Sequence, residues 1–363
     1  MKLPPLNTVF IDKLGLSFHR LDVTERQRRA ITGVLEDFCS NGRATRLAGA
    51  KKGFVNRFRV PIKEKDGLFV EINPRSPDQT VWHMKLEFNP ARYFGADKDL
   101  FTNTLKEILG TDHRLLLDGA SVNVVDLTVD HRVSLSDVAI ECREKNACGA
   151  WGKSFDSGVR LQTLYFGTRK TDHQIAAYDK RDELLAEFAK SKPGVTLKAV
   201  SDKAAKLRPR LRVEAHCKFS RRPVPLHRLA DIRDPFKGTH IYEYRNAEAV
   251  VTSTVGKLAL ELAKVSGLQV ALKHVSKAER ETLRKQLSGA AAEWWDAAEY
   301  AKQVVAAFQN TGLFSQSAFE WKHGKSKMSE HEYQLSAAKA KANAGGKVDK
   351  SKFPDLENEG DDD

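Results

Sequence analysis

The strongest constraint on the fold is a change of hydrophobic period about two thirds of the way along the chain. Up to about Pro235, short runs of alternating apolar and polar residues are separated by turn-like breaks, which is typical of strands. Beyond Pro235 the apolar residues recur at helical spacing. We therefore predict an α+β domain over residues 1–235, a helical region over 236–321 and a polar, disordered tail over 322–363.

The order of the elements predicts a largely antiparallel sheet with crossover helices. Strands are expected in "VFIDKLGLSFHRL", "FVNRFRVPI", "LFVEINP", "VWHMKLEFNP", "SVNVVDLTVDHRVSL", "VRLQTLYFGTR", "QIAAYDK" and "RLRVEAHCKF". Helices are expected in "DKDLFTNTLKEILG", "LSDVAIECREKNA" and "RDELLAEFAKS". In the helical region we predict core positions, not a base-stacking platform, at Trp294, Trp295, Tyr300, Val304 and Phe308.

Charge and composition narrow the class of partner. The 363 residues are 41% apolar, enough for a substantial core, and carry a formal net charge of +12. The segment from Arg169 to Arg222 holds 15 Lys and Arg against 7 Asp and Glu. Such a cluster suits a polyanion such as nucleic acid, because neutralised phosphates release counterions. The alternative is a solvated face that keeps the protein soluble.

Cysteine spacing and hydropathy indicate a reducing compartment. The four cysteines show no zinc-type pair spacing, and the chain shows no secretory signal. No apolar run approaches the ~20 residues that a membrane helix needs. We expect a cytoplasmic protein with free thiols and no membrane partner.

Two strands carry carboxylates among apolar residues. In "VNVVDLTVD", alternation puts Asp126, Thr128 and Asp130 on one face and the apolar side chains on the other. An ionised carboxylate there needs a partner, either an arginine or a divalent cation. Because Asp126 and Asp130 lie ~13 Å apart along a straight strand, they cannot both bind one ion. We favour Asp126 as the ligand and keep Asp130 as a second choice near DNA.

The strand "RLRVEAHCKF" supplies the complementary donors. Its polar face carries Arg212, Glu214 and His216, and the last two are ~7 Å apart along the strand. Together with Asp126 they form a mixed oxygen and nitrogen donor set that suits Mg or Mn. The alternative is a ladder of ion pairs on a sheet face.

A tyrosine in "QIAAYDK" is the candidate nucleophile. As a strand, this run puts Tyr178 and Lys180 on one face. A phenol with an ordinary pKa near ~10 becomes a useful nucleophile when a nearby cation lowers that pKa or polarises a phosphate. The alternative is a packed ring, and Tyr165 in "TLYFG" is the rival nucleophile.

Four short motifs occur in one order: "VNVVDLTVD", "TLYFGTRKTDHQ", "IAAYDKRDE" and "RLRVEAHCK". This order resembles the replication initiation factor family, whose members include initiators of rolling-circle plasmids and filamentous phages and nickases of some conjugative elements. The resemblance spans roughly Leu14 to Phe219. The sequence departs from the family pattern at Val124, where an arginine is usual, at Val125, which replaces an isoleucine, and at Thr171, which replaces a serine.

The resemblance implies a metal-dependent nickase that starts rolling-circle DNA replication. Tyr178 would attack an origin phosphodiester and become joined to the 5′ phosphate, helped by Lys180. Asp126, Glu214 and His216 would hold Mg or Mn. The implied partners are origin DNA with a single-stranded or hairpin nick site, a host helicase and a polymerase, and a homodimer is left open.

The DNA backbone is expected to follow the basic segment. The predicted contacts are Arg169, Lys170, Arg208, Arg210, Arg212, Arg221 and Arg222. Two alternatives remain on sequence grounds. One is a sequence-specific DNA-binding regulator without chemistry, and the other is a conjugative-element nickase.

Overall fold

A computed structural model of the chain describes residues 6–48, 53–62, 67–76, 82–93, 97–155, 158–168, 171–191, 196–219 and 222–320. The predicted tail over 322–363 lies outside the described residues. Three of the predicted DNA contacts, Arg169, Lys170 and Arg221, also lie outside them.

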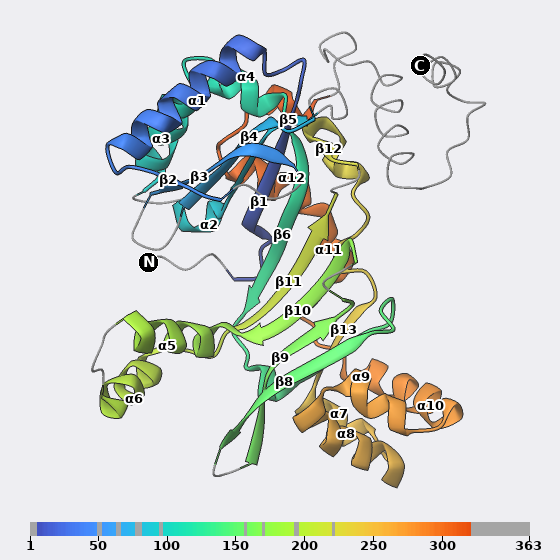
Figure 1. Cartoon of the computed structure of the whole chain (residues 1–363). Coiled ribbons are helices and arrows are strands. Elements are labelled where there is room, and N and C mark those ends of the chain that lie inside the picture. Colours follow the sequence, from blue (N-terminus) through green and yellow to red (C-terminus); the bar gives the residue numbers. More distant parts are fainter. Residues whose placement is uncertain are drawn as a thin grey trace, which may run out of the picture.

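One long antiparallel sheet organises the chain (Figure 1). Its strands lie in the order β2 (Thr45–Arg46), β3 (Phe54–Pro61), β4 (Gly67–Pro74), β5 (Trp82–Phe88), β1 (Phe10–His19), β6 (Ser121–His131), β11 (Leu211–Lys218), β10 (His173–Asp179), β9 (Gly158–Phe166) and β8 (Cys148–Phe155). The short β12 (Val224–Pro225) pairs with β6 beside this path. The predicted α+β class with a largely antiparallel sheet is confirmed.

Alternation along the central strands separates a core face from a polar face. In β6, Val125, Leu127 and Val129 are fully buried, and in β11 Leu211, Val213 and Ala215 are as well. This apolar face belongs to one continuous hydrophobic core. The polar side chains of both strands therefore share the opposite face, as their sequence spacing predicted.

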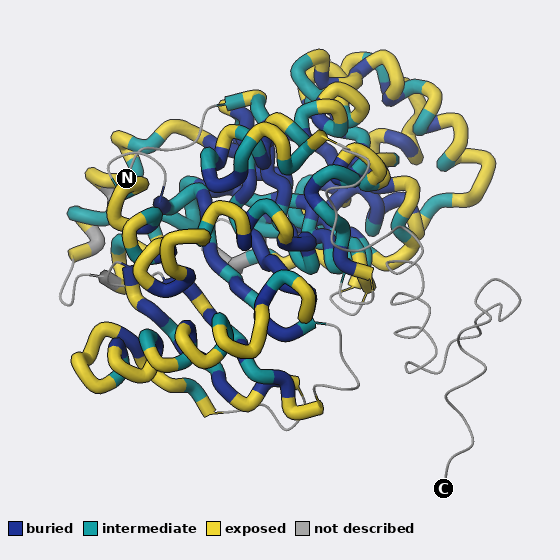
Figure 2. The backbone as a smooth tube through the Cα atoms, turned by 90° about the horizontal axis from the view of Figure 1, so that it is seen from above, coloured by how far each residue is buried: buried dark blue, intermediate teal, exposed yellow. Residues whose placement is uncertain are grey.

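Four helices pack beside the first half of the sheet, where Figure 2 shows exposed helices around buried strands. They are α1 (Glu25–Ser40), α2 (Pro90–Tyr93), α3 (Lys98–Leu109) and α4 (His113–Asp118). A capping box of Thr24 and Gln27 begins α1, a helix that our sequence analysis did not identify. The predicted helix in "DKDLFTNTLKEILG" is confirmed as α3, which ends at Gly110 with φ 84°.

The connection from β10 to β11 is helical. It consists of α5 (Lys180–Ser191), which was predicted, and α6 (Leu197–Lys206), which was not. Both helices project from the end of the sheet in Figure 1. Because β11 lies between β10 and β6, the chain leaves the sheet through these helices and then returns to fill that position.

The predicted helix in "LSDVAIECREKNA" is wrong. A 3₁₀ turn, η2 (Leu135–Asp137), leads into β7 (Val138–Cys142), which pairs with β13 (Thr239–Glu243) in a second, two-stranded sheet. All five residues of β7 are buried. A short strand that is buried on both faces has no period-two pattern, so its sequence does not distinguish it from a buried helix.

The C-terminal helices pack in two places. A separate small core is formed by α7 (Tyr244–Val250), α8 (Thr254–Ser266), α9 (Leu268–Ala271), η4 (Leu272–His274), α10 (Lys277–Leu287) and η5 (Ser288–Ala290). The main core instead takes in residues of α11 (Ala297–Lys302) and α12 (Val304–Asn310), and the turns η3 (Leu226–Asp231) and η6 (Gln316–Phe319) lie nearby.

Aromatic residues fix the last helices to the end of β6. The His131 ring lies 4.4 Å from Trp294 and 5.8 Å from Tyr300, centroid to centroid. Tyr300, Val304 and Phe308 are buried, and Trp294 and Trp295 pack against the same core. The prediction that these aromatic residues belong to the core is confirmed.

Two further sequence-based expectations concern the thiols and the membrane. The four cysteines are free: Cys142 and Cys217 are buried, while Cys39 and Cys148 are partly exposed. Within the described ranges, no helix is both long and apolar enough to cross a bilayer.

Candidate active site

The candidate residues lie in cross-strand rows on the polar face of the second half of the sheet. One row runs Thr163, Tyr178, Arg212 and Asp130 across β9, β10, β11 and β6. Directly opposite residues of an antiparallel pair have Cβ atoms only ~5 Å apart. Residues that are far apart in the sequence are thereby neighbours.

Two further rows continue the site along the strands. The second runs Tyr165, Ala176, Glu214 and Thr128, and in the third Gln174, His216 and Asp126 are adjacent. A groove of about 690 Å³ is lined by one side of α5, by the β9 and β10 members of these rows, and by Glu214 and His216 of β11. The polar faces of β10 and β11 therefore meet in one groove, and Asp126 of β6 is directly opposite His216.

Tyr178 and Glu214 are in direct contact. The Tyr178 hydroxyl donates a hydrogen bond to Glu214 Oε2 at 3.3 Å. Burial, followed by the Asp126 and Asp12 carboxylates, raises the pKa of Glu214 to about 8. Burial and the Glu214 carboxylate also raise the pKa of Tyr178 well above its ordinary value, and Arg212 offsets part of that shift. The phenol thus keeps its proton but has an acceptor beside it.

Asp126 and His216 form the neighbouring pair. They are directly opposite in the β6–β11 ladder, and His216 Nδ1 contacts Asp126 Oδ1. The Asp126 and His216 side chains are 13% and 22% exposed, and His216 lines the groove. An aspartate that touches one imidazole nitrogen fixes the orientation of the ring.

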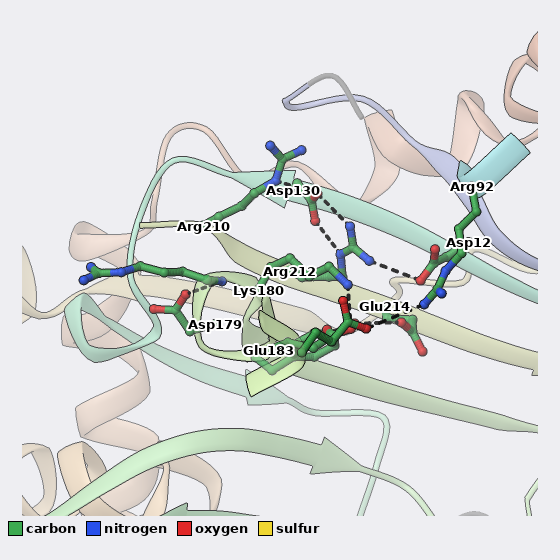
Figure 3. Close-up of polar contacts among 12 residues, drawn as sticks. Asp12, Arg92, Asp130, Asp179, Lys180, Glu183, Arg210, Arg212 and Glu214 are labelled. Atoms are coloured by element: carbon green, nitrogen blue, oxygen red, sulfur yellow. Dashed lines mark hydrogen bonds and ion pairs between the residues drawn. The ribbon is translucent and has the colours of Figure 1, made fainter. Parts of the chain in front are cut away.

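Charged side chains surround Arg212 (Figure 3), which is directly opposite Tyr178 in the β10–β11 ladder. Arg212 Nε donates to Asp130 Oδ1 at 2.7 Å and its Nη1 donates to Asp12 Oδ2 at 3.1 Å. Arg210 Nε donates to the other oxygen of Asp130 at 2.7 Å. Arg212 and Asp130 are 2% and 0% exposed, so this ion-pair network is enclosed by protein.

Lys180 is placed differently from the expectation. Strand β10 ends at Asp179, so Lys180 begins α5 instead of continuing the strand face. Its Nζ lies 2.7 Å from Glu183 Oε1, and the residue is 6% exposed. The role assigned to Lys180 stays a prediction.

The donor set for a divalent cation is incomplete as it stands. No three His, Cys, Asp or Glu side chains in the described part of the chain are grouped to hold a metal ion. The chemistry nevertheless suits a cation, because Asp126 and Asp12 both raise the pKa of the Glu214 carboxyl. Oxygen donors that repel one another in this way would be stabilised by a hard divalent ion. Asp126, Glu214 and Asp12 could supply oxygen, and His216 could supply nitrogen.

The remaining predicted DNA contacts differ in exposure. Arg208 and Arg222 are exposed, whereas Arg210 and Arg212 are buried against Asp130. Arg222 lines a second pocket of about 640 Å³, and Lys218 lines both this pocket and the groove at Tyr178. Their contacts with DNA stay a prediction.

Two site residues were missed from sequence. Asp12 reaches Arg212 because the β1–β6 register shifts between Ile11 and Lys13, which marks a bulge at Asp12. An acidic residue inside the apolar run "VFIDKL" was the available signal. Trp151 lines the groove and is 57% exposed, but its strand gave no functional signal.

Comparisons with known proteins place the chain in no family. No family model matches the chain, and no curated protein matches it. A similar solved structure is that of a rolling circle replication initiator protein from Geobacillus stearothermophilus, at 14% identity and a TM-score of 0.38. That alignment covers 82% of this chain and 97% of the other.

Proposed function

We propose that the protein is a DNA-nicking initiator of rolling-circle replication with Tyr178 as its nucleophile. The observation that carries the proposal is the hydrogen bond from the Tyr178 hydroxyl to Glu214 within an open groove. The Asp126–His216 pair lies one row further along the same sheet face. The order of the four sequence motifs supports the same assignment.

The proposed step is a transesterification at phosphorus. The Tyr178 oxygen attacks the phosphorus atom, the bond to the 3′ oxygen breaks, and the protein becomes joined to the 5′ phosphate. Glu214, which accepts the hydrogen bond of the Tyr178 hydroxyl, is placed to receive the phenolic proton. The leaving 3′ oxygen takes a proton from solvent and becomes a hydroxyl that can prime synthesis.

The negative potential of the groove explains why a divalent ion is expected. Asp179, Asp182, Glu183 and Glu214 all line the groove, whereas Lys190 and Lys218 are its two lysines. A phosphodiester would be repelled from such a surface. Mg or Mn bound by Asp126 and Glu214, with His216 or Asp12, would stabilise the charge that develops on the phosphate oxygens.

Arg212 has a supporting role in this proposal. Its guanidinium is held behind Tyr178 by Asp130 and Asp12, and it lowers the pKa of Tyr178 against the raising effect of burial and the carboxylates. A fixed positive charge at that position favours the phenolate that forms during attack. We propose origin DNA with an unpaired nick site as the substrate, a helicase and polymerase as later partners, and the cytoplasm as the location.

The test is covalent capture on supercoiled origin DNA with Mg. Tyr178→Phe is expected to abolish the protein–DNA adduct, a loss of at least about 1000-fold, because only the attacking oxygen is removed. Tyr165→Phe is the matched control, since Tyr165 lies in the same groove one row away, and it should retain the adduct. Adducts are counted on denaturing gels, with and without EDTA.

Each outcome has a defined meaning. An adduct that survives in Tyr178→Phe and disappears in Tyr165→Phe would move the nucleophile to Tyr165. Origin binding without any adduct in the unaltered protein, with Mg or Mn present, would instead favour the regulator that lacks chemistry.

A further inference from the structure

Trp151 has an unusual position for a tryptophan. It lies on β8, the edge strand of the main sheet, and 57% of it is exposed. Tryptophan is highly buried on average, so an open ring on a strand face calls for an explanation. Trp151 also lines the groove that contains Tyr178 and Glu214.

The register places this ring in the same row as the nucleophile. Trp151 is directly opposite Thr163, and Thr163 is directly opposite Tyr178. The two rings thus lie on one face, two strands apart, which is ~10 Å at the ordinary spacing between strands. A strand of DNA with a phosphate at the Tyr178 hydroxyl would pass Trp151 with a nucleotide close to that phosphate.

A single threonine lies between the two rings: Thr163 separates them in their own row, and the adjacent row carries Gly149, Tyr165 and Ala176. Because 57% of Trp151 is exposed and the residue lines the groove, its indole can receive a flat group. Lys190 on α5 and Lys218 on β11 line the same groove and offer positive charge for flanking phosphates.

We propose that Trp151 is a base-stacking residue that holds an unpaired nucleotide beside the scissile phosphate. The inference rests on the proposed function, since it takes the occupant of the groove to be single-stranded DNA. Aromatic faces bind unpaired bases with little regard for sequence, because every base has a π-face. Stacking on Trp151 would hold the backbone in register with Tyr178.

The test measures binding of a fluorescent origin oligonucleotide in a Tyr178→Phe background, where no covalent step can interfere. Trp151→Ala should weaken affinity by roughly 5- to 150-fold, the loss typical of one stacked base. Trp151→Phe should keep most of the affinity, because an aromatic face remains. Leu258→Ala is the matched control, since Leu258 is 65% exposed on α8 and is not among the residues that line the groove, and it should bind normally.

A scan of single abasic sites then identifies the nucleotide. Removing the base at one position of the oligonucleotide should weaken its binding to the protein that keeps Trp151. The same oligonucleotide should bind Trp151→Ala no more weakly than the intact oligonucleotide does. Unchanged affinity in Trp151→Ala, or an equal loss in Trp151→Phe, would overturn the inference. If Trp151→Ala weakens oligonucleotide binding but the protein with Tyr178 intact forms no covalent adduct, the proposed nicking function fails and the single-strand binding site at Trp151 stands.

Discussion

Two cross-strand ion pairs in the same sheet differ most in how far protein encloses them. In the first half, Arg57 lies opposite Glu71 and the two side chains are 2.7 Å apart and 33% and 30% exposed. In the second half, Arg212 lies opposite Asp130, also at 2.7 Å, but the side chains are 2% and 0% exposed. Both are arginine–carboxylate pairs of directly opposite residues, but the second is enclosed and its members also contact Arg210 and Asp12.

Enclosure changes how strongly such an ion pair acts on its neighbours. An exposed pair contributes about 0–1 kcal/mol and is screened by salt. A buried pair has strong electrostatic effects on its neighbours because the local dielectric is low. Arg212 accordingly offsets part of the rise that burial causes in the pKa of Tyr178, while burial, followed by the Asp126 and Asp12 carboxylates, raises the pKa of Glu214 to about 8.

The largest expected difference is in stability. Asp130→Ala should lower the free energy of unfolding by about 3 to 5 kcal/mol, because it leaves Arg210 and Arg212 buried without their shared partner. Glu71→Ala should lower it by about 1 kcal/mol or less. Urea unfolding measures both values, and equal losses in the two variants would contradict the comparison.

The next difference depends on pH. The pKa of Glu214 is about 8 in the folded protein, above its ordinary value of 4.5. The folded protein therefore loses stability as pH rises from about 4.5 to about 8, because the unfolded chain gives up this proton more easily than the folded protein does. Glu214→Gln should therefore stabilise the metal-free protein by about 3 kcal/mol at pH 7 and by little at pH 4.

The control for this pH dependence is Glu71→Gln on the open half of the sheet. It should change stability by about 1 kcal/mol or less. Thermal melting between pH 4 and pH 8 in EDTA provides the measurement. If Glu214→Gln instead lowers the stability at pH 7, the ionised Glu214 carboxylate must be stabilised by its neighbours in the folded protein, and the prediction is wrong.

The smallest effect concerns salt. A double-mutant cycle on Arg57 and Glu71 should give a coupling of about 0.5 kcal/mol that falls toward zero at high ionic strength, as the Debye length shrinks from ~10 Å to ~3 Å. The cycle on Arg212 and Asp130 should be nearly insensitive to salt. If the coupling between Arg212 and Asp130 weakens with rising salt as much as that between Arg57 and Glu71, solvent must reach the buried pair.

Part of this site could be predicted from alternation alone. The polar faces of β6, β10 and β11 follow from a period of two, so Asp126, Tyr178, Glu214 and His216 were assigned to the correct faces. Their convergence required the strand order, which alternation does not contain. The sequence motifs supplied the hypothesis that these faces belong together.

The errors have local physical causes. The strand β7 was read as a helix because its burial on both faces removes the alternation. Lys180 was assigned to the strand because nothing in "YDKRDE" marks the point where β10 becomes α5. The contact of Asp12 with Arg212 joins residues 200 positions apart through a bulge, and no local pattern encodes it.

The position of β11 between β10 and β6 has a consequence for the order of events during synthesis. The hydroxyl of Tyr178 and the carboxylate of Glu214 are separated by 36 residues of chain, and β10 has no place beside β6 until β11 has been made. A nascent chain that ends within α5 already contains Tyr178 but neither Glu214 nor Arg212. Under the proposed function, a truncated translation product would carry the tyrosine without the groups that activate it.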